Sequence, residues 1–183
     1  MNNNEKELLG ALFSAIGTVE AAIGSTPITG IDDDVSFSLR LQGNVLQATG
    51  SALSADGQES CQSFAYVGDV IQAVGNSTVI FGLLIPLPDD LDDKLIIQGN
   101  WFQAVGSFVS IVDEKIQKGD LNQALNVIGA LLQGIGNSLQ AIGGILQLKE
   151  ETNEKGLWIG VAGSWIQATG AILALLVEIK EDM

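Results

Sequence analysis

The chain has no histidine among its 183 residues and a single cysteine, Cys61. The absence of histidine removes the commonest general base and the commonest metal ligand in proteins. One cysteine excludes an intrachain disulfide and a cysteine-based metal site. We therefore predict that the protein is not an enzyme and uses no metal or organic cofactor, and that Cys61 is a small buried residue on a helix.

Charge is also scarce, because only 16% of the residues are charged, against about 25% in ordinary soluble domains. The eight Lys and Arg residues form no basic run, and the net charge is −14. Such a chain should repel nucleic acid, and nothing in it indicates a small-molecule substrate. Residues 1–7 lack the cationic start of a secretory signal, so we predict a cytoplasmic location and leave signal-less export open.

Apolar residues are abundant, at 46%, and glycine occurs 22 times. One eight-residue pattern, Gly-x-x-φ-Gln-Ala-x-Gly with φ apolar, recurs with variations about every 30 residues, the length of a helix plus a turn. Its six copies are 10–17, 43–50, 68–75, 99–106, 136–143 and 163–170. The chain is long enough for one domain with a real core, so we predict a single domain over residues 1–183.

The spacing of like residues predicts helices rather than strands. In residues 129–147 the sequence Gly-x-x-Leu-Gln recurs every seven residues, and such residues share one helical face. The units are separated by turn signals, among them Lys118-Gly119-Asp120, and by acidic runs suited to helix capping. We predict an all-α, up-down bundle with helices over 4–25, 34–55, 58–85, 89–117, 120–149 and 153–181.

Around the axis of each predicted helix, the bulky apolar residues occupy one arc, which we expect to face the core. Glycine lies on one flank of that arc and alanine on the other, so we expect both to pack against neighbouring helices, with a hinge at Gly143–Gly144 as the alternative. The predicted helix-packing residues are Gly10, Gly17, Gly43, Gly50, Gly68, Gly75, Gly99, Gly106, Gly136, Gly143, Gly163 and Gly170.

A repeated glutamine lies just beyond the glycine stripe. It is either a solvated border residue or a hydrogen-bonding residue between helices or between subunits, because a buried amide needs a partner. The candidate interface residues are Gln47, Gln72, Gln103, Gln140 and Gln167.

Charges are missing from the middles of the predicted helices. Residues 70–88, 95–112, 121–148 and 156–177 contain none, and Glu20, Arg40 and Asp69 are the exceptions near the motifs. Acids gather instead at ends and loops: 32–34, 89–93, Asp113-Glu114, 150–151, Glu178, Glu181 and Asp182. The molecule should therefore have an uncharged waist between charged ends.

Two hypotheses explain that waist. In the first, copies of a soluble bundle associate through it, which makes the protein a homo-oligomer. In the second, the waist lies in a membrane, since 156–177 is long and apolar enough to span one. The sequence favours the soluble bundle, because 120–149 is rich in amides, no loop is rich in Lys and Arg, and Trp101 and Trp165 fall mid-helix.

The repeat unit itself resembles an uncharacterised family of short, repetitive helical proteins of spore-forming bacilli. The resemblance covers nearly the whole chain and implies no activity. We therefore predict a non-enzymatic structural or interaction protein that self-associates through its uncharged surface, with a membrane-active protein, toxin-like or channel-like, as the alternative.

Overall fold

A computed structural model describes residues 1–112 and 120–181, and within them it contains only helices. The helices are α1 (Asn3–Ser25), α2 (Asp33–Gly57), α3 (Phe64–Leu84), α4 (Leu91–Val109), α5 (Leu121–Gln147), the short 3-10 helix η1 (Glu150–Thr152) and α6 (Asn153–Glu181). The predicted all-α bundle is therefore confirmed. The expected turn at Lys118–Gly119 and the acids Asp113, Glu114 and Asp182 lie outside the described residues.

Two predicted boundaries were wrong. Helix α3 begins at Phe64 rather than at residue 58, because the Ser63 side chain caps it by accepting the Tyr66 backbone N–H at 3.1 Å. Helix α4 ends at Val109, and residues 110–112 form a turn, so the predicted helix 89–117 is too long at its described end. Cys61 consequently lies in the exposed α2–α3 connection, and the prediction of a buried helical cysteine was wrong.

Polar residues cap three of the other helices. The Asn2 side chain accepts the Glu5 N–H at 2.8 Å and Glu5 accepts the Asn2 N–H in return, which forms a capping box at α1. Asp32 caps α2 through the Val35 N–H, and Asp120 caps α5. The acidic run before α4 behaves differently, since Asp90 has a left-handed backbone and makes no capping hydrogen bond.

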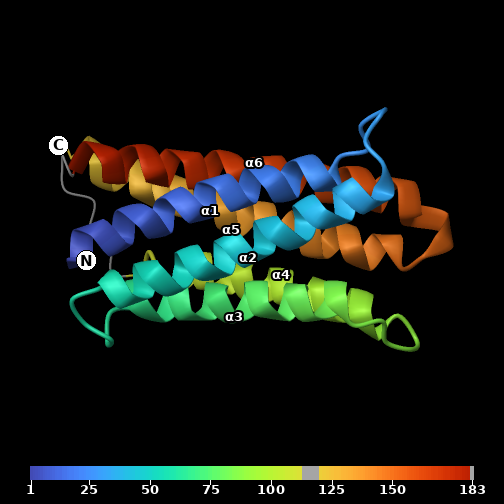
Figure 1. The fold of residues 1–183 in the computed structure, drawn as a ribbon, viewed down its shortest axis with the longest axis horizontal. Helices are drawn as coiled ribbons and strands as arrows, with labels where there is room; N and C mark the ends of the chain where they lie inside the picture. Colours follow the sequence, from blue (N-terminus) through green and yellow to red (C-terminus); the bar gives the residue numbers. More distant parts are fainter. Residues whose placement is uncertain (113–119, 182–183) are drawn as a thin grey trace.

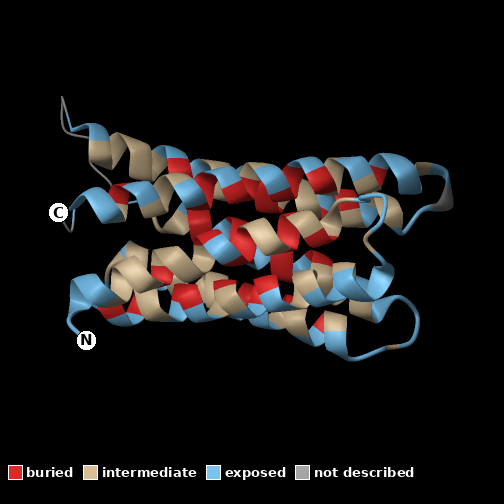
Figure 2. Cartoon of the chain, turned by 45° about the horizontal axis from the view of Figure 1, so that its top comes forward, coloured by how far each residue is buried: buried red, intermediate tan, exposed pale blue. Residues whose placement is uncertain are grey.

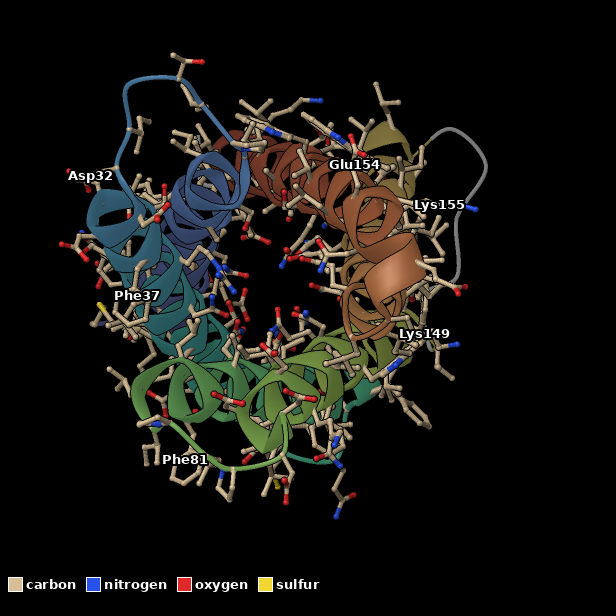
Figure 3. All side chains as sticks on the ribbon, turned by 90° about the vertical axis from the view of Figure 1, so that its right-hand side faces the viewer. Asp32, Phe37, Phe81, Lys149, Glu154 and Lys155 are labelled. Carbon is tan, nitrogen blue, oxygen red and sulfur yellow. The ribbon has the colours of Figure 1, made fainter. Side chains whose placement is uncertain are left out.

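The six α-helices form three antiparallel hairpins, α1–α2, α3–α4 and α5–α6, and the hairpins close into a ring because α6 packs against α1 (Figures 1 and 3). Among the described residues, each α-helix packs only against the α-helices beside it in the ring. One end of the bundle, here the hairpin end, carries the connections 26–32, 85–90 and 148–152. The other, the termini end, carries both chain ends and the connection 58–63 (Figure 1).

Glycines make the contact within each hairpin. A Cβ atom built on Gly43 would lie 2.5 Å from the Gly17 carbonyl oxygen, and one built on Gly17 would lie equally close to the Gly43 carbonyl. The other repeat glycines face the partner helix of their hairpin in the same way. Gly143 belongs to this seam and Gly144 packs against Ile97 of α4, so the double glycine lies within an uninterrupted helix rather than at a hinge.

The interior between these close helices holds small and polar side chains. Fully buried apolar residues in the described part of the chain are alanines, three valines and Ile97, whereas Leu, Phe and Trp side chains remain partly or largely exposed. Figure 2 shows the buried residues where the helices meet and the exposed ones along the outer faces. The expectation that the bulky arc faces the core was therefore wrong: Trp101 and Trp165 are 39% and 42% exposed. The helices lie too close together for large side chains to fit between them.

Replacing Gly43 by alanine should destabilise the bundle. The new methyl group would overlap the Gly17 backbone, which cannot move aside as a side chain can, and overpacking of this kind costs about 1–3 kcal/mol. The change can be measured as a fall in the thermal unfolding midpoint of the purified protein by circular dichroism.

Gly160 provides the matched control for this change. A Cβ atom there would meet only Gln147 Nε2, at 3.8 Å. The Gly160→Ala variant should therefore be as stable as the parent or gain up to about 1 kcal/mol from helix propensity. Equal midpoints for the two variants would show that the glycine contact does not determine the packing.

Candidate functional site

Polar side chains from the helices line the axis of the ring. The buried ones are Thr18, Asn44, Gln47, Ser51, Asn76, Asn100, Gln103, Ser107, Asn137, Ser164 and Gln167. An end-on view shows oxygen and nitrogen atoms gathered around the axis, while Phe81 lies on the outside of the ring (Figure 3). The repeat places these residues there, because an Asn or Ser commonly follows its first glycine and a Gln lies one helical turn further on.

Four of the repeat glutamines meet at the centre and form what we call the glutamine cluster: Gln47, Gln103, Gln140 and Gln167, from α2, α4, α5 and α6. Gln167 Nε2 donates to Gln47 Oε1 at 2.8 Å and makes a longer contact of 3.4 Å with Gln103 Oε1. Gln140 Nε2 donates to Gln167 Oε1 at 2.8 Å. The cluster therefore links non-sequential helices across the interior.

These contacts decide between the sequence-based interpretations of the glutamines. Gln47, Gln103 and Gln167 are 2–5% exposed, so the interpretation as solvated border residues was wrong for them. Hydrogen bonding between helices is confirmed for the cluster. Gln72 lies closer to the termini end, where the Ser107 hydroxyl contacts its Oε1 at 3.4 Å. An intersubunit contact through Gln47, Gln103 or Gln167 would need a different arrangement, since these side chains face inward.

Three cavities follow one another along the axis. A vestibule of about 590 Å³ opens at the hairpin end, and one of about 300 Å³ opens at the termini end. Between them, a neck of about 40 Å³ is lined by the glutamine cluster together with Asn44 and Asn100. Helix α5 contributes a glutamine to each of the three cavities. Gln133 lines the termini-end vestibule, Gln140 the neck and Gln147 the hairpin-end vestibule.

The two vestibules differ in charge. Glu7, Asp69 and Glu178, from α1, α3 and α6, line the termini-end vestibule. Burial, with repulsion from neighbouring carboxylates, raises the pKa of Asp69 to about 8 and the pKa of Glu178 to about 7. Arg40 of α2 lines both the neck and the hairpin-end vestibule, where Asp93 of α4 partly offsets its charge. Two of the three exceptions to the uncharged waist thus face the axis.

In the described parts of the chain, no three His, Cys, Asp or Glu side chains come close enough together to hold a metal ion. Glu20, the third exception, is half-buried on α1, and one of its carboxylate oxygens has no hydrogen-bond partner.

Several buried polar atoms along the interior are unpaired. Gln103 Nε2, Asn137 Nδ2 and Asn76 Oδ1 are inaccessible and have no hydrogen-bond partner within the protein. An unpaired buried donor or acceptor costs about 1–3 kcal/mol. The interior thus holds two unpaired amide donors, on Gln103 and Asn137, and one unpaired amide acceptor, on Asn76.

On the outer surface of the waist, every α-helix carries exposed apolar residues. Each helix contributes exposed aliphatic or aromatic residues near its middle: Ile16, Val45, Val74, Val105, Ile135 and Trp165, in chain order. Three helices, α1, α3 and α6, are long and apolar enough to cross a membrane by length and composition. Of these three, the sequence alone indicated only α6, through residues 156–177.

A family model described as a family of unknown function, DUF6944, matches residues 5–175. The chain belongs to this family. The match reaches into all six α-helices. The expected resemblance to an uncharacterised family is therefore confirmed. The source in spore-forming bacilli stays a prediction. No curated protein and no solved structure matches the chain.

Replacing Gln167 by methionine should destabilise the bundle by about 1–3 kcal/mol or more, because Gln47 Oε1 and Gln140 Nε2 would each lose a buried partner. Replacing Gln47, Gln140 and Gln167 together by leucine or methionine should recover much of that loss, since no unpaired amide of these three would remain. Thermal or denaturant unfolding measures both effects.

Gln98 is the control, because it is an exposed glutamine on α4. Its change to methionine should alter stability by no more than about 0.5 kcal/mol. A Gln167→Met variant as stable as Gln98→Met would show that the cluster contributes nothing to the fold.

Proposed function

We propose that the protein is a membrane-inserted six-helix bundle, whose apolar outer surface contacts lipid and whose polar interior runs along the membrane normal. The observation that supports this most is the inverted distribution of side chains. Amides and hydroxyls are buried, whereas bulky apolar residues such as Val74, at 52% exposed, face outward. Water disfavours this distribution, because burial of apolar surface is the main driving force for folding in water. A bilayer favours it.

The dimensions suit a bilayer. The α-helices have 19 to 29 residues, which corresponds to rods of about 28–44 Å at 1.5 Å per residue. The hydrocarbon core of a bilayer is about 30 Å thick. Helices satisfy their own backbone hydrogen bonds, as a chain in lipid must, and glycine seams are a common means of packing membrane helices.

The amides of α5 no longer weigh against a membrane location. Gln133, Gln140 and Gln147 line the axial cavities rather than the outer face. Polar residues that face the interior of a bundle are tolerated within membranes. The indole N–H of Trp165, which would be costly if unpaired in lipid, donates to Thr26 Oγ1 at 3.0 Å. Under this proposal the protein catalyses no reaction.

A lysine in place of Val74 tests the membrane location. Val74 lies in the middle of α3 on the outer face, where a charge at the centre of a bilayer costs about 2.5–3.5 kcal/mol. We expect Val74→Lys to reduce the fraction of protein that resists carbonate extraction from membranes of the expressing cells.

The matched control is Val35→Lys, in the first turn of α2, where the side chain is 46% exposed but lies beside Asp33 and Asp34 at the hairpin end. This variant should stay in the membrane fraction. A soluble bundle would tolerate both exposed lysines equally, so recovery of all three proteins in the soluble fraction would overturn the proposal.

Lateral self-association is the second candidate, and one surface feature favours it. A shallow hollow of about 780 Å³ opens on the outer face between α2 and α3, lined by small residues such as Ala48, Ala52 and Ala73 and by Val70 and Phe81. Small residues allow helices of two molecules to approach closely. We propose that copies of the chain associate through this hollow into a structural assembly.

Light scattering coupled to size exclusion, with detergent mass subtracted, tests this association. Ala52→Trp would fill the exposed hollow and should reduce the mass of the assembly, whereas Ile145→Trp, on the outer face of α5, should not. A monomeric parent protein would contradict the second candidate without affecting the first.

A further inference from the structure

The interior of the bundle has the elements of a closed pathway. Its two vestibules open at opposite ends, and the neck shares Ser25, Arg40, Ile96, Asn100 and Gln140 with the hairpin-end vestibule. The neck and the termini-end vestibule have no lining residue in common. The barrier therefore lies on the termini side of the neck, between Gln103 and Ser107. Gln103 lines the neck, and Ser107, one helical turn further along α4, lines the termini-end vestibule.

The neck is built for a molecule that both donates and accepts hydrogen bonds. It presents amide oxygens and nitrogens from four helices, and Gln103, 2% exposed, lines it with an Nε2 that has no partner. A volume of about 40 Å³ holds a water molecule or little more, since a single water needs roughly 10–15 Å³. A hydrated ion does not fit through such a neck.

The charges along the axis disfavour ions of both signs. A cation meets the Arg40 guanidinium at the neck. An anion entering from the termini end meets Glu7 and, as the pH rises through the pKa values of about 7 for Glu178 and about 8 for Asp69, the carboxylates of these two residues as well. Within a structure of low dielectric, such repulsions are much stronger than in water. An uncharged polar molecule experiences neither repulsion and can still form hydrogen bonds with the amides.

From these observations we infer that the bundle is a gated membrane pathway for small uncharged hydrogen-bonding solutes, such as water and urea, and that the glutamine cluster is its gate. The inference rests on the proposed membrane location. The gate is closed in this structure by the hydrogen bonds that Gln140 and Gln47 make with Gln167. Gln167, which these bonds hold in place, also contacts Gln103 Oε1 beside the barrier at 3.4 Å. Breaking the bonds would therefore free Gln167 and Gln103 to move and let the neck join the termini-end vestibule.

Stopped-flow light scattering of proteoliposomes tests the pathway, with osmotic water efflux and urea uptake as the readouts. All proteins carry Cys61→Ser, which removes the exposed native thiol. Gln140→Cys loses the bond to Gln167 and should raise both permeabilities several-fold above the Cys61→Ser parent. Modification with N-ethylmaleimide attaches a group too large for the neck and should return both permeabilities to the parent level.

Ile142→Cys is the matched control, because it lies two residues further along α5 on the outer face, 40% exposed. Neither the substitution nor the maleimide should change its permeabilities. Potassium and chloride fluxes should stay at the parent level in both variants. Adding Arg40→Gln to Gln140→Cys should raise potassium flux at least about tenfold, because the positive charge at the neck is removed.

Flotation of the proteoliposomes separates the two ways of failing. Protein that does not float with lipid overturns the membrane location and the pathway together. Protein that floats, with Gln140→Cys permeabilities equal to the parent or unaffected by the maleimide, overturns the pathway and leaves the membrane location standing. Potassium or chloride flux that rises together with urea flux in Gln140→Cys would overturn the selectivity for uncharged solutes.

Discussion

The close approach of backbones at the glycine seams determines the rest of this structure. Gly17 and Gly43 each lie where a Cβ atom would meet the carbonyl oxygen of the other, and equivalent pairs recur along all three hairpins. Helices this close leave no space between them for leucine, phenylalanine or tryptophan. The bulky residues must therefore point away from the seams, and the ring directs them outward while small and polar residues remain inside.

A polar interior of this kind requires partners for its amides, and the antiparallel register supplies them. Because each hairpin pairs its glycines at the same height, the glutamines of α2, α4 and α6 also come to one level, where Gln167 links Gln47 to Gln140. The pairing is incomplete, since Gln103 Nε2 has no partner. The same geometry that aligns the helices thus leaves a hydrogen-bonding site on the axis.

The sequence predicted the helices, their antiparallel order and the packing role of the glycines because these depend on local periodicity and spacing. It did not predict which face turns inward. Helical periodicity shows that Trp101 and Trp165 share an arc opposite the glutamines, but the arc is the same whether it contacts a core or lipid. The assumption that bulky residues form the core holds in water, and it failed here at every repeat. The ring closure of α6 on α1 is non-local and has no counterpart in the repeat itself.

The uncharged waist and the half-buried ionisable groups along the axis are best explained together. An outer surface free of charge, taken alone, is compatible with lipid or with other copies of the chain. Arg40, Asp69 and Glu178, however, turn toward axial cavities from three different helices, although longer side chains on a water-exposed bundle would be better solvated on its outer face. Their inward orientation is the arrangement expected where the outside cannot solvate a charge and the inside can. Under the proposed membrane location, the polar axis and the apolar exterior are two consequences of one environment, a bilayer around a polar interior.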